Sequence, residues 1–85
     1  KIVYMKDLEN KRYMINHSMD ELENELLDPY QFYRINRSAI VNLDSLVEMK
    51  SHENGRLKLS IVSNNDDNLI VARDRVSDFR EWINQ

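Results

Sequence analysis

The chain has 85 residues, of which 41% are hydrophobic and 32% charged, and its formal net charge is −3. A chain of this length folds as one domain, residues 1–85, with a modest core, which excludes a multidomain enzyme. The absence of Cys excludes disulfides and thiolate metal sites and favours a reducing, cytoplasmic setting, and no apolar run approaches the roughly 20 residues that cross a membrane.

The N-terminal part predicts a hairpin followed by a helix. Residues 2–6 and 11–16 are rich in β-branched and aromatic side chains, and the polar segment 7–10 between them predicts a turn. Ser18 with Glu21 forms a capping-box pattern that predicts a helix start. Three apolar residues at helical spacing follow before Asp28 and Pro29 end the helix: Met19, Leu22 and Leu26.

The charges are segregated along the chain. The predicted helix and its end carry five acids and no base: Asp20, Glu21, Glu23, Glu25 and Asp28. From Pro29 to Leu43 the chain contains Arg34 and Arg37 but no acid. A net charge of −3 counts against nucleic-acid binding, but this distribution allows a locally positive surface.

The second half predicts further strands and a closing helix. Residues 31–35 read as a strand, residues 46–50 and 56–62 as a hairpin through the Asn-Gly pair at 54–55, and residues 69–72 as a last strand after a turn at 64–68. One apolar stripe marks the final helix: Val76, Phe79, Trp82 and Ile83. The fold class is therefore mainly β with two short helices.

Within strand 56–62 the residues alternate between two faces. Leu57, Leu59 and Ile61 fall on one face and polar residues on the other, as in a sheet with one wet face. The aromatic residues beside Val and Ile are read as core rather than as base-stacking platforms: Phe32, Phe79 and Trp82.

Catalysis finds little support in the sequence. His17 and His52 lie far apart without metal-ligand spacing, and a single Gly excludes a Gly-rich phosphate loop. We read both histidines as solvated, at the helix entrance and at a hairpin end. No cofactor, no metal and no enzymatic activity are expected.

One segment carries several hydrogen-bond donors between apolar flanks. A strand leads into Asn36, Arg37 and Ser38, and Ile40 and Val41 follow with a buried pattern. Such flanks hold a polar tip rigidly outward. Arginine donates two hydrogen bonds to guanine or clamps a phosphate, so the tip fits DNA, although a surface salt bridge explains Arg37 equally well on composition alone.

The string F-Y-R-I-N-R-S-A-I-V-N-L-D-S-L at residues 32–46 resembles the hallmark of the LytTR family of DNA-binding domains. The similarity extends to residues 18–22, 70–73 and 79–83. It implies an elongated antiparallel β-sheet fold whose loops enter two successive major grooves and touch the minor groove between them. It also implies the output domain of a bacterial two-component response regulator, which binds double-stranded DNA at paired sites, as a homodimer brought together by an upstream receiver domain.

By position, the resemblance assigns Arg37 and Arg73 to groove contacts. It makes Asn36, Ser38 and Asn42 candidates for phosphate contacts or for supporting roles, and Lys1 the nearest residue to a third family contact. The sequence departs from the family at position 36, often His in relatives, and in the opening strand, which is missing or truncated.

Other basic residues have plainer interpretations. Arg34 is read as a strand-face residue, Arg56 and Lys58 as a solvated face or as auxiliary phosphate contacts, and Arg75 and Arg80 as helix-surface charges. The alternative to DNA binding is a protein-interaction or dimerisation module that uses open β edges or the acidic helix.

Overall fold

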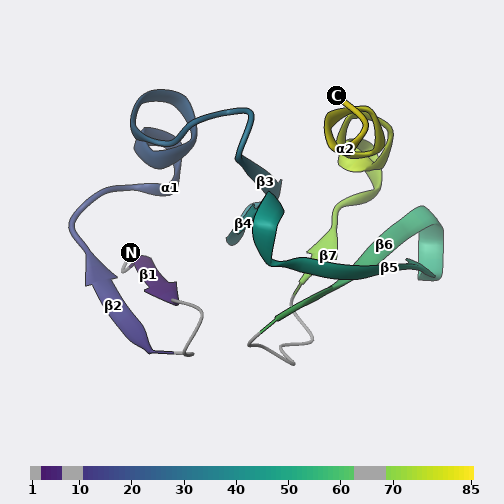
Figure 1. Cartoon of the computed structure of the whole chain (residues 1–85), viewed down its shortest axis with the longest axis horizontal. Helices are drawn as coiled ribbons and strands as arrows, with labels where there is room; N and C mark the ends of the chain where they lie inside the picture. Colours follow the sequence, from purple (N-terminus) through teal and green to yellow (C-terminus); the bar gives the residue numbers. More distant parts are fainter. Residues whose placement is uncertain (1–2, 7–10, 63–68) are drawn as a thin grey trace.

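The computed structural model describes residues 3–6, 11–62 and 69–85, and seven strands lie in these ranges (Figure 1). Their bounds are β1 (Val3–Lys6), β2 (Arg12–Ile15), β3 (Phe32–Asn36), β4 (Ala39–Asn42), β5 (Leu46–His52), β6 (Arg56–Ile61) and β7 (Ile70–Val71). The predicted turns at 7–10 and 64–68 lie outside the described residues, as does Lys1.

The strands form three antiparallel sheets, with the orders β1-β2, β3-β4 and β5-β6-β7. A backbone hydrogen bond from Ala72 N to Ile35 O (2.9 Å) joins β3 to the end of β7, so the second and third sheets are neighbours. The seven strands and short helices confirm a mainly β fold with two short helices, and the strands lie in three small sheets. The principal extents are 32 × 25 × 24 Å.

The helical segments are short. In chain order they are α1 (Met19–Glu21), the π-helical turn η1 (Leu22–Leu26), the 3-10 turns η2 (Leu43–Ser45), η3 (Glu53–Gly55) and η4 (Arg73–Arg75), and α2 (Val76–Ile83). Helix α2 lies over the β5-β6-β7 side of the molecule, whereas α1 lies above the β1–β2 hairpin (Figure 1).

The core forms where α2 meets β3, β6 and β7. Phe79 is fully buried, and its ring centroid lies 5.4 Å from that of Tyr33 and 5.7 Å from that of Trp82. The indole Nε1 of Trp82 donates to the Pro29 carbonyl (2.7 Å). Buried aliphatic residues complete this core: Ile35, Val41, Leu57, Leu59, Leu69 and Val71.

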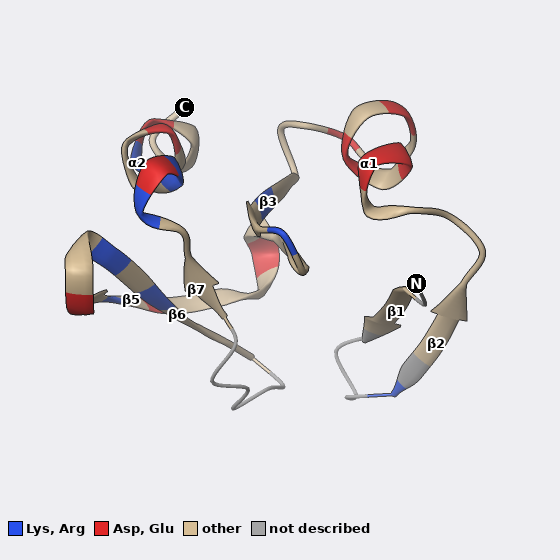
Figure 2. Ribbon diagram, turned by 180° about the vertical axis from the view of Figure 1, so that it is seen from behind, with Lys and Arg blue, Asp and Glu red and all other residues tan. Residues whose placement is uncertain are grey.

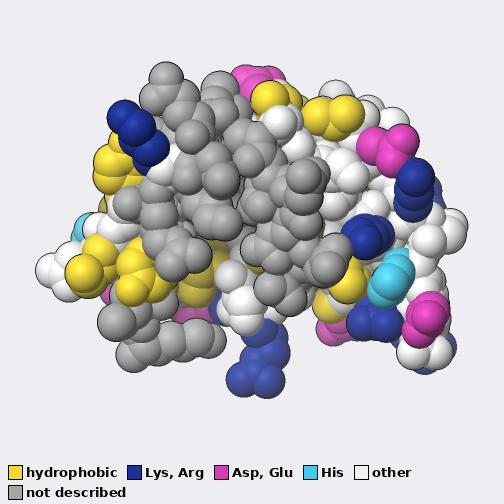
Figure 3. Space-filling view, turned by 90° about the horizontal axis from the view of Figure 1, so that it is seen from below, with side chains coloured by type: hydrophobic (Ala, Val, Ile, Leu, Met, Phe, Trp, Pro, Cys, Tyr) yellow, Lys and Arg dark blue, Asp and Glu magenta, His cyan; other side chains and the backbone are white. Residues whose placement is uncertain are grey.

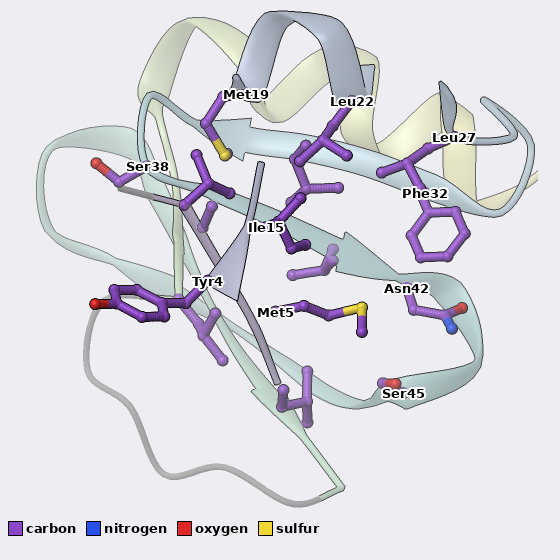
Figure 4. Close-up of a pocket in the computed structure, with 16 residues that line it drawn as sticks. Tyr4, Met5, Ile15, Met19, Leu22, Leu27, Phe32, Ser38, Asn42 and Ser45 are labelled. Atoms are coloured by element: carbon purple, nitrogen blue, oxygen red, sulfur yellow. The ribbon is translucent and has the colours of Figure 1, made fainter. Parts of the chain in front are cut away.

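A second apolar region is the pocket between the β1–β2 hairpin and β3–β4, with a volume of about 470 Å³ (Figure 4). Phe32 lies on its wall and is half-buried, so the prediction that placed Phe32 in the core is wrong. The reason is that β3 alternates: Tyr33 and Ile35 face α2 and the main core, which leaves Phe32 on the opposite side.

The predicted capping box is present at the entrance of α1. The Glu21 backbone N–H donates to the Ser18 hydroxyl and the Ser18 N–H donates to the Glu21 carboxylate, both at 3.1 Å. The carboxylate also lies 3.5 Å from Nδ1 of His17. The hydrogen bond from the Ser18 backbone, and then that from His17, lower the pKa of Glu21.

The predicted helix changes from α-helical to π-helical hydrogen bonding after Glu21. Leu27 N donates to Leu22 O (3.0 Å), an i→i+5 bond that widens the last turn. Leu22 is buried as predicted, but Leu26 is exposed, which contradicts its assignment to the apolar face. The wider turn directs Leu27 instead of Leu26 toward the pocket.

Ser18→Ala is expected to lower the free energy of unfolding by about 1 kcal/mol, because the Glu21 N–H loses its acceptor at the helix entrance. Urea unfolding of both proteins at pH 7 measures the difference. Ser18→Thr is the matched control, since it keeps a hydroxyl at the cap; equal stability of all three proteins contradicts a stabilising cap.

Candidate nucleic-acid interface

The loop between β3 and β4 is a tight connection whose conformation is fixed by Asn36. Its amide Nδ2 donates to the Ile70 carbonyl of β7 (2.8 Å), and its Oδ1 accepts from the Ser38 backbone N–H (2.7 Å). The β3–β4 register shifts between Arg34 and Asn36. Asn36 therefore holds the loop from inside, and Ser38 is exposed beside it.

Arg34 supports the same loop from the β3 side. Its Nη2 donates to the Arg37 carbonyl (2.9 Å) and its Nε to the Asn36 carbonyl (3.3 Å). Only 14% of its side chain is exposed. The guanidinium thus donates to two backbone carbonyls at the β3–β4 turn.

Two acids of the N-terminal helical segment bind the remaining side of Arg34. Its Nη1 lies 2.6 Å from Asp20 Oδ1 and 3.2 Å from Glu23 Oε1. The hydrogen bond to Asp20 is the main reason that the pKa of Arg34 is raised. Arg34 is therefore more than a residue on the strand face, because it joins β3, the loop and the acidic helix.

Arg75 extends this network. Its Nη1 donates to the Arg34 carbonyl (3.1 Å) and lies 3.8 Å from Glu23 Oε2. The prediction that Arg75 is only a helix-surface charge is wrong, because η4 brings it against the backbone of β3. Arg80 on α2 is exposed, as expected.

Arg37 lies at the tip of the loop with an exposed side chain. Among residues 3–6, 11–62 and 69–85, no side chain or carbonyl binds its guanidinium, so the alternative of a surface salt bridge gains no support in this part of the chain. Its own backbone carbonyl is held by Arg34. The charged group is presented to solvent from a loop whose backbone is fixed.

Arg73 lies at a second position, directly after β7. It is exposed, and its side chain covers the β5–β6 turn: a Cβ placed on Gly55 would lie 3.5 Å from Arg73 Cγ. Asn54 and Gly55 have φ of 59° and 75°, the left-handed region that this Asn-Gly pair predicts. The Arg73 stem thus lies within van der Waals reach of the turn, and the positive φ is what favours Gly at position 55.

Arg37 and Arg73 lie toward opposite ends of the β3–β7 contact. Residue 35 bonds to residue 72 and residue 36 to residue 70, so the two strands run antiparallel. Ile70 anchors the loop that carries Arg37. Arg73 follows three residues later, which corresponds to a separation of about 10 Å from Ile70 along an extended chain. The structure therefore presents two exposed guanidinium groups from separate places.

Further basic side chains line the outward face of the β5–β6 hairpin. Lys50 pairs with Lys58 and His52 with Arg56 in the register, on the face opposite the buried Leu57 and Leu59. Dark blue side chains gather on this side of the molecule in Figure 3. Lys50 lies 3.3 Å from Glu48, an exposed ion pair.

The remaining candidates differ in position. Asn42 is at the far end of β4, where its Oδ1 accepts from Gln31 Nε2 and from Asp44 N (3.1 Å). It caps η2 and is not brought to the loop that holds Arg37. Figure 2 shows acids on α1, and also on α2 and at the β5–β6 turn, with basic segments on β3, the following loop, the β5–β6 hairpin and the start of α2.

Comparison with known families favours DNA binding over the protein-interaction alternative. The family described as LytTr DNA-binding domain matches residues 2–84. The chain belongs to the LytTR DNA-binding domain family. This match covers nearly the whole sequence, confirms the resemblance seen in residues 32–46, and makes DNA the partner of this LytTR domain. Comparisons with curated proteins and with solved structures gave no match.

Among residues 3–6, 11–62 and 69–85, no group of three or more His, Cys, Asp or Glu side chains is placed to hold a metal ion. In the same ranges, no helix has the length and apolar composition that would let it cross a membrane.

Proposed function

We propose that this LytTR domain binds double-stranded DNA with sequence preference by inserting loops into the DNA grooves. The observation that carries the proposal is the exposed Arg37 guanidinium on a loop that Arg34 and Asn36 hold by four hydrogen bonds. Arg37 reads a base edge, and Arg73 makes the second groove contact from a separate place on the fold.

Rigid presentation of Arg37 gives selectivity. A planar guanidinium donates two parallel hydrogen bonds to O6 and N7 of guanine, and each such pair discriminates against a wrong base by about 1–3 kcal/mol. A flexible loop loses part of that energy to ordering on binding. Because Asn36 uses its amide inside the protein, its role is to support the loop, and Ser38 is left to contact a phosphate.

The negative net charge does not oppose this proposal, because the acids nearest the loop are paired. Asp20 and Glu23 are paired with Arg34 and Arg75, whereas the side chains of Arg37 and Arg73 are exposed. Phosphates approaching the basic face meet Lys50, Arg56 and Lys58 as sequence-independent contacts.

The wider setting follows from the resemblance. We place the domain in the cytoplasm as the non-enzymatic, cofactor-free output part of a two-component transcriptional response regulator. An upstream receiver domain brings two copies together on paired sites. One copy has few basic contacts and binds weakly, so pairing raises the effective affinity for adjacent half-sites.

Salt dependence tests the DNA proposal. The logarithm of the association constant should fall linearly with the logarithm of salt concentration, with a slope of about −0.9 for each neutralised phosphate. Fluorescence anisotropy with a labelled duplex between low and moderate salt measures that slope, and Lys58→Ala should make it shallower by about one contact. A slope near zero contradicts phosphate contacts.

The alternative, a protein-interaction module, has one observation in its favour. The β1–β2 hairpin exposes large apolar side chains, including Tyr4 (49%), Met5 (49%) and Met14 (72%). A two-stranded sheet with an apolar surface suits pairing with another protein strand. Complex formation that is insensitive to salt and unaffected by Arg37→Ala would favour this function.

A further inference from the structure

We propose that Asp20 and Glu23 set the base specificity of this domain without touching DNA, by positioning Arg37 through Arg34. The inference rests on the proposed function, since Arg37 must read a base for its position to matter. It assigns a role to the acidic helical segment, which lies beside the loop and which phosphate would repel.

The geometry makes Arg34 a connector between the acids and the loop. One side of its guanidinium donates to the carbonyls of Asn36 and Arg37, at 3.3 and 2.9 Å. The Nη1 side binds Asp20 and Glu23, at 2.6 and 3.2 Å. A planar guanidinium with a fixed fork cannot shift at one side without shifting at the other. The place of the acids therefore determines the place of the two loop carbonyls.

The groups around Arg34 leave it little freedom. The side chain is 14% exposed, and Arg75 Nη1 binds the Arg34 carbonyl from the other side while also lying 3.8 Å from Glu23. Asn36 fixes the loop to β7 independently. Asn36 and Arg34 therefore hold the loop backbone at two points. Because Arg34 binds the Arg37 carbonyl, its position sets the direction in which the Arg37 side chain leaves the loop.

Bulk electrostatics and positioning predict opposite results when the acids are neutralised. Removing negative charge strengthens attraction to phosphates on every sequence, so non-specific affinity rises. Loss of positioning weakens the base contact, so affinity for the preferred sequence gains less or falls. The ratio of the two affinities separates the effects.

The test compares Asp20→Asn/Glu23→Gln with Glu25→Gln/Glu81→Gln, which removes the same charge from exposed positions of the same fold. Affinities are measured at one salt concentration for the duplex preferred by the wild-type domain and for a scrambled duplex. The preferred-to-scrambled ratio should fall about tenfold in the first double variant. In the control both affinities should rise together with the ratio unchanged.

A second arm shows whether the effect acts through Arg37. In an Arg37→Ala background, Asp20→Asn/Glu23→Gln should change the ratio no further, because the positioned group is gone. Amide spectra of residues 36–38 and thermal unfolding confirm a folded domain; if the double variant unfolds, Asp20→Asn alone, at an 80% exposed side chain, replaces it.

The outcomes distinguish failure of the positioning role from failure of the proposed DNA-binding function. A ratio that changes no more than in the control overturns the positioning role, and so does a change that persists in full without Arg37. A wild-type domain with equal affinity for both duplexes instead overturns the proposed function itself, before any acid is altered.

Discussion

Arg37→Ala is expected to weaken binding to the preferred duplex by about 1–3 kcal/mol while leaving affinity for a scrambled duplex nearly unchanged. The reason is that, in the function we propose, the exposed Arg37 guanidinium supplies a base contact and other basic side chains supply most phosphate contacts. Competition anisotropy with both duplexes measures the two affinities in parallel. The altered domain should also accept substitutions at the base pair that Arg37 reads.

Two controls make the result specific to that side chain. Arg80→Ala removes an equal charge from the exposed face of α2 and should weaken both duplexes slightly and equally. Arg37→Lys keeps the charge but loses the planar fork, so it should bind the scrambled duplex like the wild type without regaining the preference for the selected duplex. If Arg37→Ala behaves like Arg80→Ala, the loop does not read bases.

Phe79→Ala should lower the free energy of unfolding by about 3–5 kcal/mol, because it empties a fully buried site between the rings of Tyr33 and Trp82. Native domains are stable by about 5–15 kcal/mol, and a domain this small is expected near the low end, where such a loss leaves a large share of the variant unfolded. Urea unfolding followed by Trp82 fluorescence measures the change.

Phe79→Leu is the matched substitution, since it keeps an apolar group of similar volume and should lose much less stability. The loss of Phe79 also loosens η4, which precedes α2 and carries Arg73 and Arg75. DNA affinity should therefore fall with the folded fraction. A Phe79→Ala domain as stable as the wild type would show that α2 is not part of the core.

Local patterns in the sequence predict much of this fold. Alternation in residues 56–62 places Leu57 and Leu59 in the core because successive strand residues face opposite sides. Ser18 and Glu21 form their capping box because both partners lie within one turn. The stripe containing Phe79 and Trp82 is likewise buried. Each of these features depends on residues a few positions apart.

Features set by distant parts of the chain escape such patterns. Arg34 binds Asp20, 14 residues before it, and receives a hydrogen bond from Arg75, 41 residues after it, so no local pattern shows its role. Leu26 is exposed because the last turn is π-helical, which shifts the apolar phase by one residue. Spacing alone could not reveal either arrangement.

In the candidate site, too, some features follow from the local sequence and others depend on contacts between distant residues. The motif string correctly brings Asn36, Arg37 and Ser38 together in one loop, and the resemblance points to Arg73 beyond it. Asn42, although part of the same string, lies at the other end of β4, because a four-residue strand carries it about 10 Å away from the loop. The supporting roles of Arg34 and Arg75 follow only from the tertiary contacts.

The central claim is that loops on this domain read DNA sequence, and selection from a random duplex library at low salt tests it most directly. The domain is used alone and fused to a dimerising coiled coil, beside folded Arg37→Ala and Arg73→Ala variants. We expect an enriched motif, present in two copies for the fusion and lost or relaxed in either variant. Recovery of unenriched sequences by both wild-type forms would contradict sequence readout and favour the protein-interaction function.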